Sequence, residues 1–382
     1  MKKIVFTHSI NSIVGKFTSL FLGIYFLKIT DGNIPIVVMY YLVKYLFNIP
    51  ASFITLKMIN KNNVISLYRL GLLSNGLCLL VLLFLGKSVI NYIFIFAMID
   101  SFTSLLYWSP YKMILYNFQK DSELKNIFSS NSMVTSLISI MSIIGMGYLI
   151  TSLSYAIVFI VIFILSLIAM IVTFRFDPYN FEIQKLKVKN LKYSFKDKKA
   201  KEIYNLVFWE GIGYRGGLDT TITILLFLIL GTEFSLGKYS ALFALFGLIT
   251  AYIVKKYLKE KSNKRLFFIS SIAILLSTLP IIFIKSFSLF IAYNIVFNIA
   301  YKITQILVDS SVFKIADNEI ISKYKIEYTF LHESIHSIGK ALSEFLLLIV
   351  TIYYFSHHNY QIIAAILSFS VLIQAFIYRK IK

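Results

Sequence analysis

Long apolar runs, separated by short polar stretches, recur along the whole chain. Each run is about 20 residues long, which is the length that a helix needs to cross the hydrocarbon core of a bilayer. Helices are expected because hydrocarbon offers no partner for unpaired backbone N–H and C=O groups. The pattern predicts twelve spans, at residues 8–27, 34–56, 65–86, 89–115, 130–150, 154–174, 205–230, 236–254, 266–284, 287–308, 328–350 and 360–378.

The longest polar stretch, residues 176–201, follows the sixth predicted span and divides the chain into two halves. It is charged and has no strong helical periodicity, so we expect a linker, with a short amphipathic helix on the membrane surface as the alternative. The halves share a faint similarity, since residues 92–96 and 293–297 open the fourth and tenth spans with related sequences. The predicted divisions are an N-terminal half at 1–174, a basic linker at 175–204 and a C-terminal half at 205–382.

Composition supports a membrane protein. Of 382 residues, 58% are hydrophobic and only 15% are charged, and the mean hydropathy is +0.76. The net charge of +20 lies in the loops, with nine basic residues between 175 and 201 and six between 255 and 265. This asymmetry follows the positive-inside rule, so it predicts cytoplasmic termini in the cell membrane, with lipid headgroups rather than nucleic acid as partners. Cys78 is the only cysteine, which excludes a disulfide within the chain.

Ionisable residues inside the predicted spans are the most informative feature, because each costs about 2.5–3.5 kcal/mol on insertion scales. Such residues face protein or water, so the helices that carry them are inner helices. Spans three, six, nine and twelve carry none beyond their ends and can face lipid. The charged positions within spans are Lys16, Lys44, Asp100, Glu210, Arg215, Asp219, Lys302, Asp309, Glu333, Lys340 and Glu344.

Several of these residues can be paired by spacing or by elimination. Arg215 and Asp219 are four residues apart and can meet on one helical face, either as a permanent ion pair or as a switch that exchanges a proton or a substrate cation. Asp100 has no cation nearby on its own helix, so it pairs with Lys44 or another helix, or is protonated, and it is the leading candidate for proton coupling.

The twelve-helix arrangement in two halves, with a basic central loop and polar residues on helices one, four, seven and ten, resembles the major facilitator superfamily. The sequence Glu333-Ser-Ile-His-Ser-Ile-Gly-Lys340 is similar to a pattern at the start of helix eleven in bacterial permeases of that family, and Tyr107-Trp-Ser-Pro-Tyr111 in span four also resembles them. The resemblance implies that helices one, four, seven and ten line a central cavity. It places Glu333 and His336 near an inner gate, with Lys340 and Glu344 deeper and able to neutralise each other.

The chain departs from the family pattern in two places. The loop between helices two and three usually contains G-x-x-x-D-R-x-G-R, but residues 57–69 lack the Asp-Arg pair, which weakens inference about gating. The helix-five motif of drug antiporters is reduced to Gly145-Met-Gly147, so multidrug export has no positive support from that motif.

A different function is suggested by His332-Glu-Ser-Ile-His336, which satisfies the zinc-binding pattern H-E-x-x-H. A catalytic zinc needs a third protein ligand, and spacing does not choose among Asp309, Asp317 and Glu344. An intramembrane zinc metallopeptidase also gives no reason for charges on every third helix, so we expect no metal, no cofactor and no enzymatic activity. A non-transporting membrane receptor or immunity protein on the same fold is the third possibility.

The sequence therefore predicts a secondary active transporter that opens a midplane site to each side of the membrane in turn. We expect a monomer that is coupled to protons and exports a small or amphipathic compound whose identity the sequence does not give. The expected coupling and cavity residues are Asp100, Arg215, Asp219, Lys44, Asp309 and Lys302, and the expected gate and structural polar residues are Glu333, His336, Lys340, Glu344 and Glu210.

Overall fold

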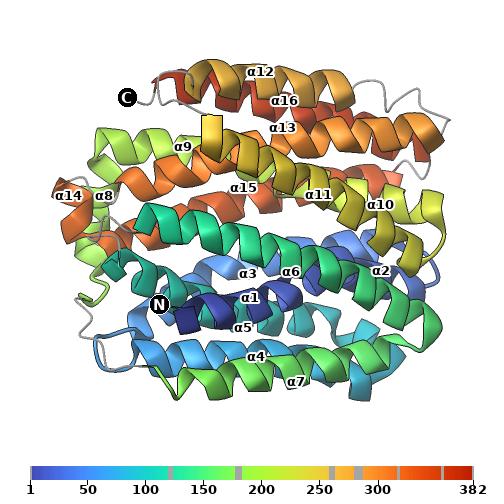
Figure 1. The fold of residues 1–382 in the computed structure, drawn as a ribbon, viewed down its shortest axis with the longest axis horizontal. Helices are drawn as coiled ribbons and strands as arrows, with labels where there is room; N and C mark the ends of the chain where they lie inside the picture. The colour runs from blue at the N-terminus through green and yellow to red at the C-terminus, as the bar shows by residue number, and fades with distance from the viewer. Residues whose placement is uncertain are drawn as a thin grey trace. The chain divides into compact units, whose positions relative to one another are not determined.

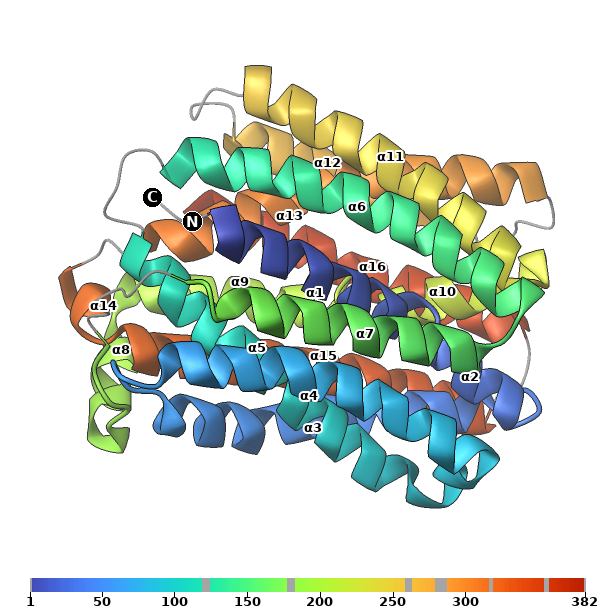
Figure 2. The same ribbon diagram turned by 60° about the horizontal axis from the view of Figure 1, so that its bottom comes forward.

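The computed structural model describes residues 2–118, 124–176, 183–257, 263–278, 287–315, 319–353 and 357–380. These residues form almost entirely helices (Figures 1 and 2), as the apolar runs predict. They divide into two compact units, one of residues 1–186 with 231–241 and the other of residues 187–230 with 242–382.

Each predicted span lies on one long helix or on two consecutive helices, although residues 279–284 of the ninth lie outside the described residues. The α-helices are α1 (Lys2–Leu20), α2 (Leu22–Ile29), α3 (Ile34–Met58), α4 (Val64–Leu85), α5 (Ile93–Phe118), α6 (Leu124–Ser152), α7 (Tyr155–Thr173), α8 (Leu191–Lys196), α9 (Lys198–Ile212), α10 (Gly217–Leu230), α11 (Glu233–Tyr257), α12 (Asn263–Thr278), α13 (Phe287–Lys314), α14 (Glu319–Lys323), α15 (Lys325–Tyr353) and α16 (His357–Lys380). Two 3₁₀ segments, η1 (Gly86–Tyr92) and η2 (Val188–Asn190), complete the described elements.

Among the described residues, nine helical segments are long and apolar enough to cross a membrane. One of them, Val64–Tyr116, contains both α4 and α5. The described apolar part of α6, Ser136–Ser152, is shorter, and α12 has 16 described residues. The fold is therefore a multi-helix membrane bundle, and the count of twelve spans stays a prediction.

Within the first unit, α1 packs against α6 and α7, while α4 packs against both α5 and α7. Within the second unit, α9 packs against α15 and α16, and α12 packs against α13 and α16. If α1 is matched with α9 and each later span with its counterpart, the same four pairs of helices pack together in both units. The faint sequence similarity between the halves thus has a counterpart in their internal packing.

The start of α11 packs with the first unit rather than the second. A Cβ atom added to Gly147 of α6 would lie 2.6 Å from the carbonyl oxygen of Glu233, so the backbones are close at this point. The Glu233 carboxylate forms a 2.5 Å ion pair with Lys28 and accepts a 3.1 Å hydrogen bond from the Tyr155 hydroxyl. These contacts place residues 231–241 in the first unit, although they follow α10 of the second unit along the chain.

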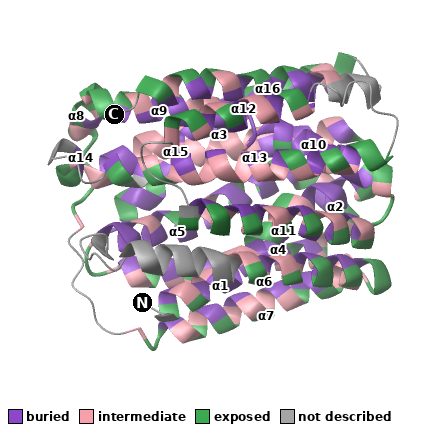
Figure 3. Cartoon of the chain, turned by 45° about the horizontal axis from the view of Figure 1, so that its top comes forward, coloured by how far each residue is buried: buried purple, intermediate pink, exposed green. Residues whose placement is uncertain are grey.

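Exposed apolar side chains follow one face of α7 and of α16, and Figure 3 colours exposed residues green. On α7 the exposed positions recur at helical spacing, and α16 shows a similar series. A membrane supplies the apolar surroundings that such stripes need, so these helices match the expected lipid-facing role. The exposed positions are Ile157, Ile160, Ile164, Ile168 and Ile171 on α7 and Ile366, Phe369, Ile373 and Phe376 on α16.

Candidate functional site

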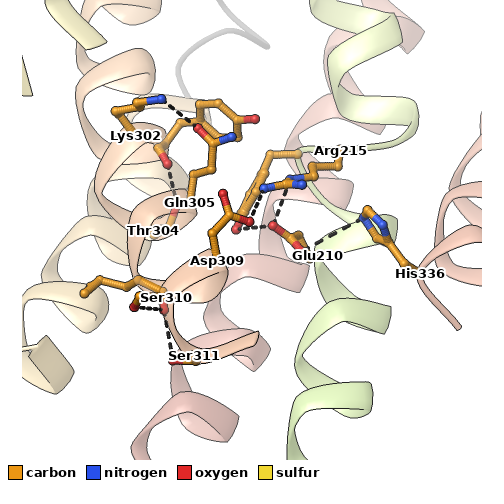
Figure 4. A network of polar contacts seen from close by, with 12 residues as sticks. Glu210, Arg215, Lys302, Thr304, Gln305, Asp309, Ser310, Ser311 and His336 are labelled. Atoms are coloured by element: carbon orange, nitrogen blue, oxygen red, sulfur yellow. Dashed lines mark hydrogen bonds and ion pairs between the residues drawn. The ribbon is translucent and has the colours of Figure 1, made fainter. Parts of the chain in front are cut away.

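Arg215 lies at the centre of a charged cluster in the second unit (Figure 4). Its Nε atom is 2.9 Å from the Oε1 atom of Glu210 on α9, and its Nη2 atom donates a 2.9 Å hydrogen bond to the Oδ1 atom of Asp309 on α13. One guanidinium thus bridges two carboxylates from different helices. We call Glu210, Arg215 and Asp309 the charge cluster.

Arg215 reaches both acids because the seventh span is not one continuous helix. α9 ends at Ile212 and α10 begins at Gly217, so residues 213–216 connect two separate helices. The backbone N–H that opens α10, that of Gly217, donates a 2.7 Å hydrogen bond to the Ser343 hydroxyl on α15, which satisfies a group that the interruption would leave unpaired. The expected four-residue spacing of Arg215 and Asp219 on one helix face therefore does not apply.

Glycines bring this interrupted span close to α15. A Cβ atom on Gly339 would lie 2.2 Å from the carbonyl oxygen of Phe208, and one on Gly211 would lie 2.5 Å from the carbonyl oxygen of His336. Both distances are too short for any side chain, so the two helices touch through their backbones. The glycines at this contact thus serve close packing of the two helices.

The two acids of the charge cluster differ in side-chain exposure. The Glu210 side chain is 3% exposed, that of Arg215 is 25% exposed and that of Asp309 is 48% exposed. Around Glu210, the Tyr214 hydroxyl donates a 3.3 Å hydrogen bond to Oε1, and the Nε2 atom of His336 lies 4.0 Å from Oε2. The half-exposed carboxylate of Asp309 and the buried carboxylate of Glu210 are thus linked through one guanidinium.

A second buried carboxylate, that of Glu344 on α15, lies beside α10. It is fully buried, and its Oε1 atom accepts a 2.6 Å hydrogen bond from the Thr220 hydroxyl. Its Oε2 atom has no hydrogen-bond partner among the described residues. Lys340 is near enough to interact electrostatically with Glu344, as expected, and the contact with Thr220 is one that the sequence did not signal.

The other predicted residues of the second unit lie outside the hydrogen bonds and ion pairs described so far. Asp219 lies in the first turn of α10, and Lys340 is half-buried on α15. The Lys302 ammonium donates a 3.2 Å hydrogen bond to Gln305 on its own helix, α13 (Figure 4). Glu333 is 3.4 Å from the Nδ1 atom of its neighbour His332. Of the predicted residues, the structure brings Glu210, Arg215, Asp309 and His336 together.

In the first unit, Lys44 of α3 and Asp100 of α5 form a buried ion pair. Their charged atoms are 2.5 Å apart, and their side chains are 12% and 9% exposed. The Tyr40 hydroxyl, one helical turn before Lys44, also donates a hydrogen bond to the same oxygen of Asp100. Of the alternatives that the sequence left open for Asp100, the structure shows the pair with Lys44.

A second polar cluster in this unit, around His8, was not anticipated. The Nδ1 atom of His8 on α1 is 2.7 Å from the Tyr107 hydroxyl, and the His8 ring stacks on Tyr111 with centroids 4.4 Å apart. Thr7 and Tyr68 are linked by a 2.8 Å hydrogen bond beside it. The sequence had singled out the segment from Tyr107 to Tyr111, but gave no indication that it contacts His8, 99 residues away.

Among the residues that the structure describes, the H-E-x-x-H motif is not joined by a third metal ligand. The rings of His332 and His336 are 6.2 Å apart, and His336 is directed toward Glu210 of α9. Within the described parts of the chain, no group of three or more His, Cys, Asp and Glu residues is arranged to hold a metal ion. Asp317, one of the proposed third ligands, lies outside the described residues.

Comparison with known structures identifies the fold. A crystal structure of a bacterial homologue of the iron transporter ferroportin in an outward-facing state matches with a TM-score of 0.71 and 12% identity, covering 99% of this chain and 98% of that one. A second crystal structure of such a homologue, with soaked iron, matches with a TM-score of 0.68, the same identity and the same coverage. A search of curated protein sequences finds no match.

The family model of the Major Facilitator Superfamily matches residues 4–324, which is most of the chain. With the apolar helices and the fold, this match points to a multi-pass membrane transporter rather than an enzyme. The chain belongs to the Major Facilitator Superfamily.

Proposed function

We propose that this transporter is driven by protons and that the charge cluster is where the proton binds. The single observation that carries the proposal is the arrangement of Arg215 between Glu210 and Asp309, at 2.9 Å from each. Two carboxylates share one guanidinium, and Lys340 of α15 also faces Glu210, so a proton that binds either acid changes the balance of charge in the cluster. Protonation of either acid leaves Arg215 paired with the other alone, which changes the link between α9 and α13.

The surroundings of Glu210 support a proton site with several interacting groups. The titratable or charged groups that face Glu210 are Tyr214 and Arg215 from its own span, Asp309 from α13, and His336 and Lys340 from α15. A protonation change at Glu210 therefore acts on two other helices of the unit. Asp100 is the second candidate coupling group, since its protonation would release both Lys44 and Tyr40.

Aromatic rings beside the cluster support a substrate with an apolar portion. Tyr214 meets Tyr301 edge to face with ring centroids 4.8 Å apart, and Tyr301 stacks on Phe297 at 5.9 Å. Apolar pockets with a few polar groups suit small organic ligands. We therefore favour a small or amphipathic compound, moved outward in exchange for protons. Iron is named for the similar structures, which share the fold with this chain at 12% identity. It is not part of the substrate proposed for this chain.

The proposal also covers the membrane location, the orientation and the oligomeric state of the protein. The basic residues between 183 and 201 and those near the end of α16 favour a cytoplasmic location for the linker and for both termini, in the cytoplasmic membrane. We expect a monomer, because each half supplies its own polar cluster.

The test begins with a substrate. Thermal melting of the purified full-length protein against a ligand panel should identify compounds that raise the melting temperature, since a ligand that binds only the folded state stabilises it. Uptake of such a compound into proteoliposomes is then measured with and without an imposed pH gradient. We expect the gradient to drive accumulation, and a protonophore to abolish it.

The variant Glu210→Gln should lose gradient-driven accumulation while it still binds the ligand. Glu202→Gln, on the same helix and outside the cluster, is the matched control and should accumulate the compound like the unchanged protein. Accumulation that ignores the gradient, or that survives in Glu210→Gln, would contradict the proposed coupling site. A ligand that binds but is never moved would favour the non-transporting receptor instead.

A further inference from the structure

Residues 187–201 of the second unit carry an unusual density of positive charge. The segment contains η2, α8 and the first turn of α9. Its one acidic residue, Asp197, is engaged in capping α9, because its Oδ1 atom accepts a 2.8 Å hydrogen bond from the Ala200 backbone N–H. Seven exposed lysines remain, which we call the lysine face: Lys187, Lys189, Lys192, Lys196, Lys198, Lys199 and Lys201.

Three contacts anchor this segment to the rest of the unit. The Lys187 backbone N–H and the Asn190 amide are 3.0 Å and 3.4 Å from the Oε1 atom of Glu327, a buried residue in the first turn of α15. The hydroxyls of Ser194 and Tyr204 are 2.6 Å apart. Figure 1 shows α8 beside α14, near the start of α15. The lysines therefore project from a backbone that is held in place, unlike those of a solvated linker.

Apolar side chains are exposed among the lysines. Val188 is 62% exposed and Phe195 is 50% exposed. Free water is an unfavourable environment for such groups, and nothing in a solvated linker requires them. A helical segment long and apolar enough to cross a membrane, Lys198–Leu230, begins directly after α8, so an interfacial position for the exposed groups is consistent with the sequence of elements.

We propose that the lysine face is a binding site for an anionic phospholipid of the adjacent leaflet. The lipid phosphate meets the lysine ammonium groups, while its glycerol and upper acyl carbons cover Val188 and Phe195. Charge complementarity selects an anionic headgroup, and the apolar groups select a lipid over a free anion or a polynucleotide. Since Glu327 fastens the segment to α15, a bound lipid also braces the start of that helix. The inference does not depend on the proposed proton coupling.

The test titrates the full-length protein in detergent with a short-chain phosphatidylglycerol and measures its melting temperature. We expect a saturable rise, and little rise with phosphatidylcholine of the same chain length. Lys192→Gln with Lys196→Gln should raise the midpoint lipid concentration at least about tenfold, because each lysine near a charged lipid contributes about fivefold. Val188→Ser should also raise the midpoint, with the lysines intact.

The matched control replaces two exposed lysines of the first unit, Lys57→Gln with Lys61→Gln, and should keep the original midpoint. Equal midpoints in the two double variants would overturn the proposal, because any effect would then follow net charge alone. A rise with phosphatidylcholine equal to that with phosphatidylglycerol, no rise with either, or an equal rise with inorganic phosphate at the same concentration would overturn it as well.

Discussion

Lys44 and Asp100 are each nearly buried and form an ion pair. The pair lowers the energetic cost of burying each charge inside the first unit. Removing one partner of a buried ion pair leaves an uncompensated charge, which costs about 3–5 kcal/mol. We predict that Asp100→Asn lowers the melting temperature of the purified protein clearly, because the Lys44 ammonium then loses its carboxylate.

The double variant Lys44→Met with Asp100→Asn should recover part of that loss, since no unpaired charge remains. Asp31→Asn, in the exposed turn after α2, is the control and should melt like the unchanged protein. If the double variant melts below Asp100→Asn, the ion pair is not the source of the destabilisation.

Sequence reasoning identified the charged residues but paired only some of them. Asp100 has no cation within reach on its own helix, which left a partner on another helix or protonation, and the structure shows Lys44 as the partner. Arg215 was matched with Asp219 by spacing, but spacing has meaning only on an unbroken helix. Its contact with Asp309, 94 residues away, depends on how α9 and α13 pack, which apolar patterning does not specify.

At the scale of the helices, the contact between α9 and α15 depends on Gly339. An alanine there would place its Cβ atom 2.2 Å from the Phe208 carbonyl oxygen, so the helices must separate. Forcing extra volume into a close contact costs about 1–3 kcal/mol. We predict that Gly339→Ala lowers the melting temperature and, by moving α15, also weakens transport.

Gly145→Ala is the matched control on α6, because a Cβ atom at that position meets nothing within 4 Å. Alanine favours a helix over glycine by up to about 1 kcal/mol, so this variant should melt at the same temperature or higher. A similar loss in both variants would show that helix propensity, and not the close contact, controls stability.

The apolar pattern predicted where the helices lie, but not where they are interrupted. Residues 8–27 and 205–230 read as single spans, whereas each falls on two consecutive helices. Apolar periodicity continues through both interruptions, and only the glycines near 213–217 hinted at the second. The end of the basic linker is likewise more structured than its composition suggests, because α8 and η2 are held by contacts with Glu327 and Tyr204.

At the scale of the whole molecule, the two units repeat one packing scheme but carry different chemistry. The first unit holds a closed pair, Lys44 with Asp100, whereas the second holds one arginine between two acids. The first pair is nearly buried and closed to other charges, whereas Asp309 of the charge cluster is 48% exposed and can be reached by one. We therefore expect substitutions in the charge cluster of the second unit to reduce proton coupling more than substitutions of Lys44 or Asp100 in the first unit.

Simultaneous measurement of substrate and proton movement tests the central claim most directly. Proteoliposomes that contain the protein and a lumenal pH dye are given the substrate, with no pH gradient imposed. We predict proton movement opposite to the substrate, absent in Glu210→Gln and retained in Glu202→Gln. Substrate movement without any change in lumenal pH, or proton movement that is unchanged in Glu210→Gln, would contradict it.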